Sequence, residues 1–168
     1  MATIAEKLTY REFRSKYEQG DRSFEYWKGA AIPKGMPTWI HGFLQGLVIQ
    51  LLREAGYVAA SEVELRIVGD AHPKPDVIAT SGAIEEPYPT KAVDIVVEIL
   101  SEDDTMPYVL EKCEAYETWG FKFIYIVNPE NRQLFRWTGR GLEISSELTS
   151  IPAARIWEHL DQALRKNA

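Results

Sequence analysis

The chain has 168 residues, of which 45% are hydrophobic and 26% charged, so its composition is that of a folded globular protein and excludes disorder as its main state. Its 19 basic and 25 acidic residues leave a formal net charge of −6. This charge argues against a strongly basic nucleic-acid-binding protein, but not against an enzyme whose acidic site needs a metal ion. The single cysteine, Cys113, excludes a disulfide framework and a cysteine-rich zinc site.

The sequence contains no run of 18 apolar residues, and residues 1–13 include no apolar signal region. We therefore expect a cytoplasmic protein that has no membrane partner. The length predicts one domain over 1–168. Within it we expect an N-terminal helix and hairpin over 9–37, a core over 38–145 and a C-terminal helix over 150–168.

The N-terminal third of the chain predicts two helices with a hairpin between them. Thr9 and Glu12 form a capping-box pattern, which predicts a helix over 9–19. Residues 24–32 are typical of a short hairpin. Residues 38–55 predict a long helix because apolar side chains recur there at intervals of three and four positions. These side chains are Ile40, Phe43, Leu44, Leu47, Val48, Leu51 and Leu52.

The middle of the chain predicts three strands. Alternation of apolar and polar residues predicts a strand over 63–67, with Glu62 on its polar side. Residues 75–79 (PDVIA) form a short predicted strand that opens on a proline. Residues 93–100 (VDIVVEIL) are almost all apolar and rich in β-branched side chains, which is typical of a central strand buried on both faces.

The C-terminal part continues with helix, strand, hairpin and helix. A helix is predicted over 105–119 and is ended by Gly120. Residues 121–127 (FKFIYIV) indicate another buried strand, residues 133–145 a hairpin, and residues 150–152 the start of a last helix. This order predicts a mixed α/β fold, with a meander of strands followed by a crossover helix to a further strand.

Two acidic residues on predicted neighbouring strands are the first candidates for chemistry. Glu98 interrupts the apolar run of the central strand, where a carboxylate is costly unless it is paired, protonated or bound to a metal ion. A strand-end position or a salt bridge to an arginine is the alternative explanation. Asp76 opens the preceding strand, although an aspartate in a turn after a proline is a common arrangement. Because neighbouring strands lie about 4.8 Å apart, the two carboxylates can share one divalent ion.

Lys112 is the third candidate. On a helical wheel it lies at the border of the buried face, between Tyr116 and Trp119. The alternative is a lysine whose stem packs on these rings while its ammonium stays in water. Asp, Glu and Lys together suit hydrolysis at phosphorus: carboxylates bind Mg²⁺ or Mn²⁺, the ion activates water, and the lysine stabilises developing charge.

Several segments resemble one protein family. They are Pro75-Asp76-Val77, IVVEILSEDDT from residue 95, EKCEAYETWG from residue 111 and IYIVNPENRQL from residue 124, together with the upstream segments FEYWKGAAI and Trp39-Ile40-His41. They resemble the Uma-two family of bacterial restriction-endonuclease-like proteins, within the PD-(D/E)xK nuclease superfamily. The resemblance covers about residues 9–145. It implies a restriction-endonuclease-like core, in which a central mixed β-sheet is flanked by helices.

The resemblance also assigns residues one by one. Asp76 matches the motif aspartate and Glu98 the acidic residue of the second half-motif. The usual lysine two positions later is absent, since residue 100 is leucine, and the lysine on the following helix corresponds to Lys112. Tyr108 and Asn128 stand where family members often carry aspartate. Both departures argue against a second metal ion and against full activity. Neither changes the set of Asp76, Glu98 and Lys112.

The resemblance and the residues together predict a divalent-metal-dependent endonuclease that hydrolyses phosphodiester bonds of nucleic acid, with DNA favoured over RNA. Asp76, Glu98 and the backbone carbonyl of Ile99 would hold Mg²⁺ or Mn²⁺, and Lys112 would orient water. The weaker candidates are accessory residues at the site and a basic stripe for phosphates: Glu62, His41 and Tyr108, and then Arg132, Arg136 and Arg140. The alternative explanations are an exposed strand residue for Glu62, a helix cap for His41 and a charged edge strand for the three arginines.

Two other functions remain open at this point. The nuclease fold can serve as a catalytically inactive binding or assembly module, and 19 aromatic residues can supply a homodimer patch. A metal-dependent hydrolase for a small phosphorylated or sugar substrate is the third possibility, because a fold does not specify a function. We expect a homodimer in either of the first two cases.

Overall fold

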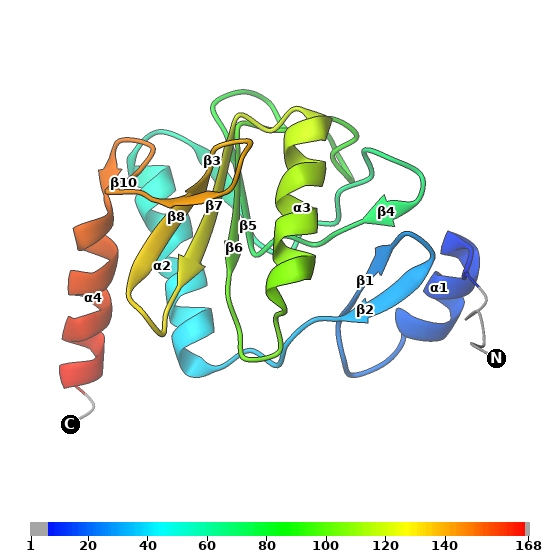
Figure 1. Cartoon of the computed structure of the whole chain (residues 1–168), viewed down its shortest axis with the longest axis horizontal. Helices are drawn as coiled ribbons and strands as arrows, with labels where there is room; N and C mark the ends of the chain where they lie inside the picture. Colours follow the sequence, from blue (N-terminus) through cyan, green and yellow to red (C-terminus); the bar gives the residue numbers. More distant parts are fainter. Residues whose placement is uncertain (1–6, 167–168) are drawn as a thin grey trace.

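A six-stranded mixed sheet divides the molecule, with helices on both of its faces (Figure 1). The computed structural model describes residues 7–166. The order of the strands is β3-β5-β6-β7-β8-β9, in which β6 and β7 are parallel and all other neighbours antiparallel. Their bounds are β3 Val58–Ala60, β5 Val77–Thr80, β6 Ile95–Ile99, β7 Phe123–Asn128, β8 Gln133–Trp137 and β9 Leu142–Ile144.

Both faces of the sheet are covered by helices. The crossover helix α3 (Met106–Trp119) joins the parallel strands β6 and β7 and packs on one face. Helices α2 (Trp39–Glu54) and α4 (Ala153–Arg165) lie together on the other face (Figure 1). Successive residues of β6 point to opposite faces, so Val96 belongs to the core under α3 and Val97 to the core under α2.

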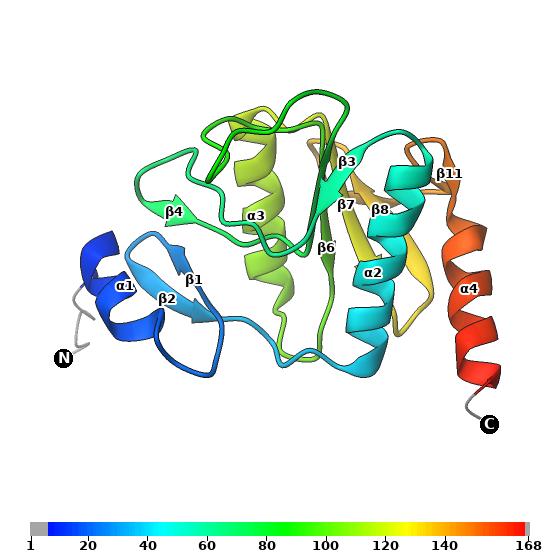
Figure 2. The same cartoon turned by 180° about the vertical axis from the view of Figure 1, so that it is seen from behind.

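A smaller sheet and the first helix lie beside α3 (Figure 2). The sheet has the order β2-β1-β4, and α1 packs against it through aromatic contacts such as Phe13 with Tyr26, whose ring centroids are 5.4 Å apart. Trp27 at the end of β1 contacts the ring of Tyr108 on α3. These elements span α1 Tyr10–Tyr17, β1 Phe24–Trp27, β2 Ala30–Pro33 and β4 Ala71–His72, and a separate pair of short strands consists of β10 Glu147–Leu148 and β11 Ile151–Pro152.

The mixed α/β fold and most of the predicted elements are confirmed. The capping box of Thr9 and Glu12 forms at α1, and Gly120 ends α3 in the left-handed conformation with φ of 103°. The last helix begins at Ala153 rather than at residue 150, because Ile151–Pro152 pairs as β11.

The strand predicted over 63–67 is wrong. Glu62 has φ of 56° in a turn, and the backbone N–H groups of Glu62, Leu65 and Arg66 donate to the carbonyls of Pro75, Pro73 and Pro89 respectively. Proline has no N–H with which to donate back, so a reciprocal ladder cannot form. The strand that pairs with β5 is instead β3, which lies earlier in the chain.

Across residues 7–166, no helix combines the length and the apolar character needed to span a bilayer. Residues 1–6, which belong to the N-terminal segment considered for a signal region, lie outside the described residues. Residues 167–168, at the end of the predicted C-terminal helix segment, lie outside them too.

Candidate active site

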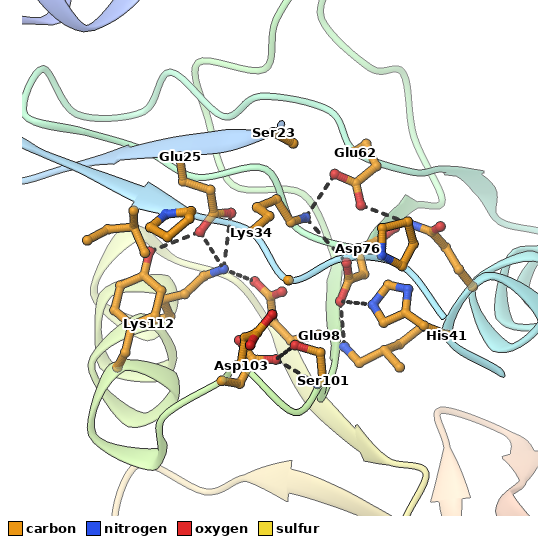
Figure 3. Close-up of a pocket in the computed structure, with 18 of the residues that line it drawn as sticks. Ser23, Glu25, Lys34, His41, Glu62, Asp76, Glu98, Ser101, Asp103 and Lys112 are labelled. Atoms are coloured by element: carbon orange, nitrogen blue, oxygen red, sulfur yellow. Dashed lines mark hydrogen bonds and ion pairs between the residues drawn. The ribbon is translucent and has the colours of Figure 1, made fainter. Parts of the chain in front are cut away.

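A pocket of about 690 Å³ opens where β5 begins and β6 ends, beside α3, and the predicted carboxylates lie in its wall (Figure 3). The first turn of α2, the segment after β2 and strand β1 close it from the other sides. Its charged lining residues are Glu25, Lys34, Glu62, Asp76, Glu98, Asp103, Asp104 and Lys112, with His41 beside them.

Asp76 and Glu98 are brought together by the register of β5 on β6. Val77 lies opposite Val97 in this antiparallel pair, so the next position places Asp76 opposite Glu98 on the same face. The backbone N–H of Ile99 donates to Asp76 Oδ2 at 2.7 Å, which ties the aspartate to the end of β6. The sequence prediction that these two carboxylates share one site agrees with this arrangement.

Glu98 is buried, and two polar groups contact the same oxygen of its carboxylate, Oε1. The hydroxyl of Tyr116 donates to this oxygen at 2.6 Å, and Lys112 Nζ lies 2.6 Å from it. Burial raises the pKa of Glu98 to about 7, against the Lys112 ammonium, which lowers it. Within the described residues no hydrogen bond reaches Oε2, so this oxygen remains for a ligand in the pocket.

Lys112 lies inside the protein rather than at its border. Its ammonium contacts both oxygens of Glu25, at 3.1 and 3.2 Å, in addition to Glu98. An ammonium has three donors, and three carboxylate oxygens surround this one. Burial alone lowers the pKa of Lys112, but Glu25 and Glu98 together hold the pKa well above its ordinary value. The alternative of a lysine with its ammonium in water is therefore wrong.

Three groups that carry positive charge or donate a hydrogen bond surround the carboxylate of Asp76: His41, Lys34 and the Ile99 N–H. His41 Nε2 lies 3.4 Å from Oδ2, the oxygen that Ile99 also binds, and Lys34 Nζ lies 3.3 Å from Oδ1. Burial acts to raise the pKa of Asp76, but these neighbours outweigh it and hold the pKa well below the usual carboxyl range. The hydrogen bond to Asp76 in turn raises the pKa of His41.

Two of the closest charged residues were missed by the sequence reasoning, Glu25 and Lys34. Glu25 is buried in β1, where its Oε1 also accepts the backbone N–H of Lys74 at 2.7 Å. A signal for it was present, since an acid stands between the aromatic residues of FEYW. Lys34 follows β2 in a polar loop, where a lysine carries no local signal.

The three accessory candidates, Glu62, His41 and Tyr108, all line the pocket. Glu62 lies in the pocket wall, not on a strand, and pairs with Lys34 at 2.8 Å. Tyr108 donates to Glu25 Oε2 at 2.9 Å, so the residue that replaces the family's aspartate is bound to a carboxylate. His41 is the third residue of α2, and its backbone N–H donates to the Thr38 cap.

The three arginines do not line this pocket. Arg132 is bound to Asp161 of α4 at 2.6 Å, Arg136 lies over the ring of Phe123, and Arg140 is exposed in the turn between β8 and β9. They are spread from one end of β8 to the other, with Arg132 held in an ion pair. The structure therefore does not gather them beside the carboxylates.

The oxygen donors of the pocket fit a hard divalent cation. Asp76 and Glu98 supply carboxylate oxygens, and the carbonyl of Ile99 points to the same side as its N–H, toward Asp76. In the part of the chain that is described, no cluster of three or more His, Cys, Asp or Glu side chains is arranged to hold an ion. Two carboxylates, a carbonyl and several waters are a donor set that Mg²⁺ accepts.

Comparisons with known proteins bear on the family and the fold of the chain. A family model, Uma2, described as "Putative restriction endonuclease", matches residues 10–160. No curated protein matches the chain. Among solved structures, a crystal structure of "a putative nuclease belonging to DUF820" from Anabaena variabilis is similar, with a TM-score of 0.68 at 22% identity over 83% of this chain and 85% of that one. The predicted restriction-endonuclease-like fold is thereby confirmed, and the chain belongs to the Uma2 family.

Proposed function

We propose that this protein is a divalent-metal-dependent nuclease that hydrolyses phosphodiester bonds in DNA. The observation that carries the proposal is the set of Asp76 and Glu98 on paired strand ends, with Lys112 Nζ 2.6 Å from Glu98 in the same pocket. Two carboxylates that can hold a metal ion and a lysine that can stabilise developing charge suit metal-assisted hydrolysis of a phosphodiester. The family description, which names a restriction endonuclease, supports DNA as the substrate.

Asp76, Glu98 and the Ile99 carbonyl would hold the ion, Mg²⁺ or Mn²⁺. When bound, the ion lowers the pKa of a coordinated water and offsets the charge of a phosphate. The ion is needed before an anionic substrate can approach, because Glu25, Glu62, Asp76 and Glu98 outnumber the lysines Lys34 and Lys112 in the pocket.

Lys112 would hold Glu98 and contact a phosphate that binds in the pocket. Its three donors are engaged with Glu25 and Glu98, so contact with a water or a phosphate oxygen requires it to release one oxygen of Glu25. Glu25 therefore serves as the alternative acceptor that keeps the ammonium in place. Tyr116, donating to the same Glu98 oxygen, fixes the orientation of that carboxylate.

A second candidate is a nuclease-fold binding module without cutting activity. The observation that favours it is that Lys34 and Lys112 already pair with Asp76 and Glu98 without any added ion. In this case the protein would bind its partner as a homodimer and need no metal.

The experiment compares the full chain with Glu98→Ala on supercoiled plasmid, linear duplex, single-stranded DNA and RNA, each with Mg²⁺, Mn²⁺ or EDTA. The control variant is Glu102→Gln, which changes an exposed carboxylate on the neighbouring loop that does not line the pocket. We expect nicking and linearisation of plasmid by the wild type and the control, only with metal. Glu98→Ala should lose at least about 100-fold in rate, as for removal of a group that stabilises the transition state.

Two results would contradict the proposal. Metal-dependent cleavage that persists in Glu98→Ala would exclude this site as the catalytic one. No cleavage of any substrate by a folded wild type would favour the binding module. RNA cleaved in preference to DNA would keep the chemistry and correct the substrate.

We also propose that the protein is a homodimer. Large apolar side chains are exposed near the pocket mouth and at both edges of the main sheet, and they include Met36, Trp39, Met106, Val58 and Ile144. Light scattering after size-exclusion chromatography should give about twice the 19.2 kDa of one chain. A mass of one chain at concentrations up to the micromolar range would exclude the dimer.

A further inference from the structure

Lys34 is the cation in the pocket that the nuclease chemistry does not use. Its side chain is 15% exposed, and its ammonium contacts Glu62 Oε2 at 2.8 Å, Asp76 Oδ1 at 3.3 Å and the carbonyl of Lys74 (Figure 3). Lys112, by comparison, is enclosed by Glu25 and Glu98 at the other end of the pocket. The two lysines thus compensate different carboxylates.

The contacts of Asp76 show what Lys34 occupies. Oδ2 accepts the Ile99 N–H and lies near His41, whereas Oδ1 has only the Lys34 ammonium among its described neighbours. Oδ1 is therefore the oxygen of Asp76 that a divalent ion can take. An ammonium and a divalent cation in contact with this one oxygen repel each other, and the repulsion is strong because Asp76 is buried.

The backbone around Lys34 holds it in this place. Gly35 passes so close to the loop after β6 that an added Cβ would lie 2.4 Å from Ser101 Oγ. The segment after β2 thus crosses the pocket against residue 101, and the Lys34 side chain extends from it toward Asp76. A side chain at position 35 would therefore have to displace the Ser101 hydroxyl.

We propose that the Lys34 ammonium is the resident cation of the carboxylate pocket and competes with the divalent ion for Asp76 Oδ1. This inference rests on the proposed function, since it concerns the same metal position. On metal binding the ammonium leaves Asp76 and keeps Glu62 and the Lys74 carbonyl as partners, so the displacement is small. The competition makes metal affinity lower than the carboxylates alone would give, and keeps the metal-free pocket compensated.

The test measures Mn²⁺ binding to the metal-free full chain by isothermal titration calorimetry, with the metal alone as ligand. Lys34→Met and Lys34→Gln remove the charge, and the glutamine retains a donor for Glu62. Lys34→Arg keeps the charge. Lys74→Met is the matched control, because it removes a charge two residues before Asp76 whose side chain does not line the pocket. Asp76→Asn removes a proposed ligand, so the binding heat that disappears in this variant comes from Mn²⁺ at this site.

We expect Lys34→Met and Lys34→Gln to bind Mn²⁺ about tenfold more tightly, the scale of one lost ion pair. Lys34→Arg and Lys74→Met should stay within about twofold of the wild type, and Asp76→Asn should not bind. Melting of each metal-free variant checks that it folds.

Each other result decides against part of the proposal. Equal affinity in the wild type and both charge-removing variants would overturn the competition and leave the metal site standing. A gain in Lys74→Met as large as in Lys34→Met would also overturn it, because the effect would be general electrostatics. No Mn²⁺ binding by any variant would overturn both this inference and the metal-dependent function. Tighter binding without any nuclease activity would support the competition and reject the proposed function.

Discussion

The charges around Lys112 form a buried unit that spans the chain. Glu25 lies 87 positions before Lys112 in the sequence, and Glu98 lies on the neighbouring strand β6. Taking the lysine away leaves two carboxylates without a cation in a place with little water. Breaking such a group costs far more than its formation contributes, because desolvation is not recovered.

We therefore predict that Lys112→Met destabilises the metal-free protein by about 3–5 kcal/mol, since Glu25 and Glu98 then face each other without a cation. Urea unfolding of the metal-free variant measures this. The matched control is Lys91→Met, whose side chain is 85% exposed, and it should change the free energy of unfolding by less than about 0.5 kcal/mol. A loss below about 1 kcal/mol in Lys112→Met would show that the buried unit is not formed.

Asp76 predicts a pH dependence of stability. Because His41, Lys34 and the Ile99 N–H outweigh burial and hold its pKa below the unfolded value, the folded state binds its proton less readily than the unfolded state does. Its contribution is fully present above the unfolded carboxyl pKa and is lost as the pH falls through the folded pKa.

Asp76→Asn removes this contribution, so in EDTA it should be less stable than the wild type by about 2 kcal/mol at neutral pH. The difference should shrink as the pH falls below about 4. Urea unfolding of both proteins at a series of pH values checks it. A difference that stays constant with pH would contradict the assignment of the low pKa to Asp76.

At the scale of elements, the crossover helix α3 carries both the lysine and the tyrosine that hold Glu98. Its end is set by Gly120, whose φ of 103° lies in the left-handed region. A Cβ added there would meet only Ala92 Cβ, at 3.8 Å, so the requirement for glycine is conformational and not steric. Helix α2 carries a different kind of glycine, Gly46, which is exposed and surrounded by open space.

The two glycines predict opposite effects of alanine. Gly120→Ala should destabilise the protein by about 1 kcal/mol, because alanine is strained in the left-handed conformation. Gly46→Ala should stabilise it by up to about 1 kcal/mol through helix propensity. Thermal and urea unfolding of both variants measures the pair. If both changes had the same sign, one of the two backbone conformations would be wrong.

At the scale of the whole molecule, the pocket is lined by elements that lie far apart in the sequence. The hairpin β1–β2 supplies Glu25 and the segment after it supplies Lys34, while the main sheet and the residue before β5 supply Glu98 and Asp76. A divalent ion at the pocket would bind the folded state alone. Metal should therefore stabilise the entire fold rather than one loop.

We predict that Mn²⁺ at about 100 times its dissociation constant raises the free energy of unfolding by about 2.7 kcal/mol. Glu98→Ala should show no such gain, and Glu102→Gln should show all of it. Urea unfolding with Mn²⁺ and with EDTA provides the comparison. An equal gain in Glu98→Ala would place the bound ion elsewhere on the protein.

The features that could be read from the order of residues are those with a local cause. Helix α2 follows from apolar residues at helical intervals, and β6 from a continuous apolar, β-branched run. Glu98 could be identified because a charge inside such a run is itself a local signal, and Asp76 because it opens the strand next to it. Lys112 could be identified from its place on the helical wheel, and the family resemblance pointed to the same lysine.

Features that depend on contacts between separate segments of the chain could be seen only in the folded structure. The segment 63–67 alternates as a strand should, but its backbone partners are proline carbonyls far along the chain, which the alternation does not reveal. Lys34 is an ordinary residue in the sequence, and the place of Glu25 among aromatic residues does not reveal its partner. Both residues acquire their roles only where the hairpin meets α3 and β5. The reason is physical: periodicity reports which side of an element is buried, whereas the compensation of buried charge depends on which elements come to lie together.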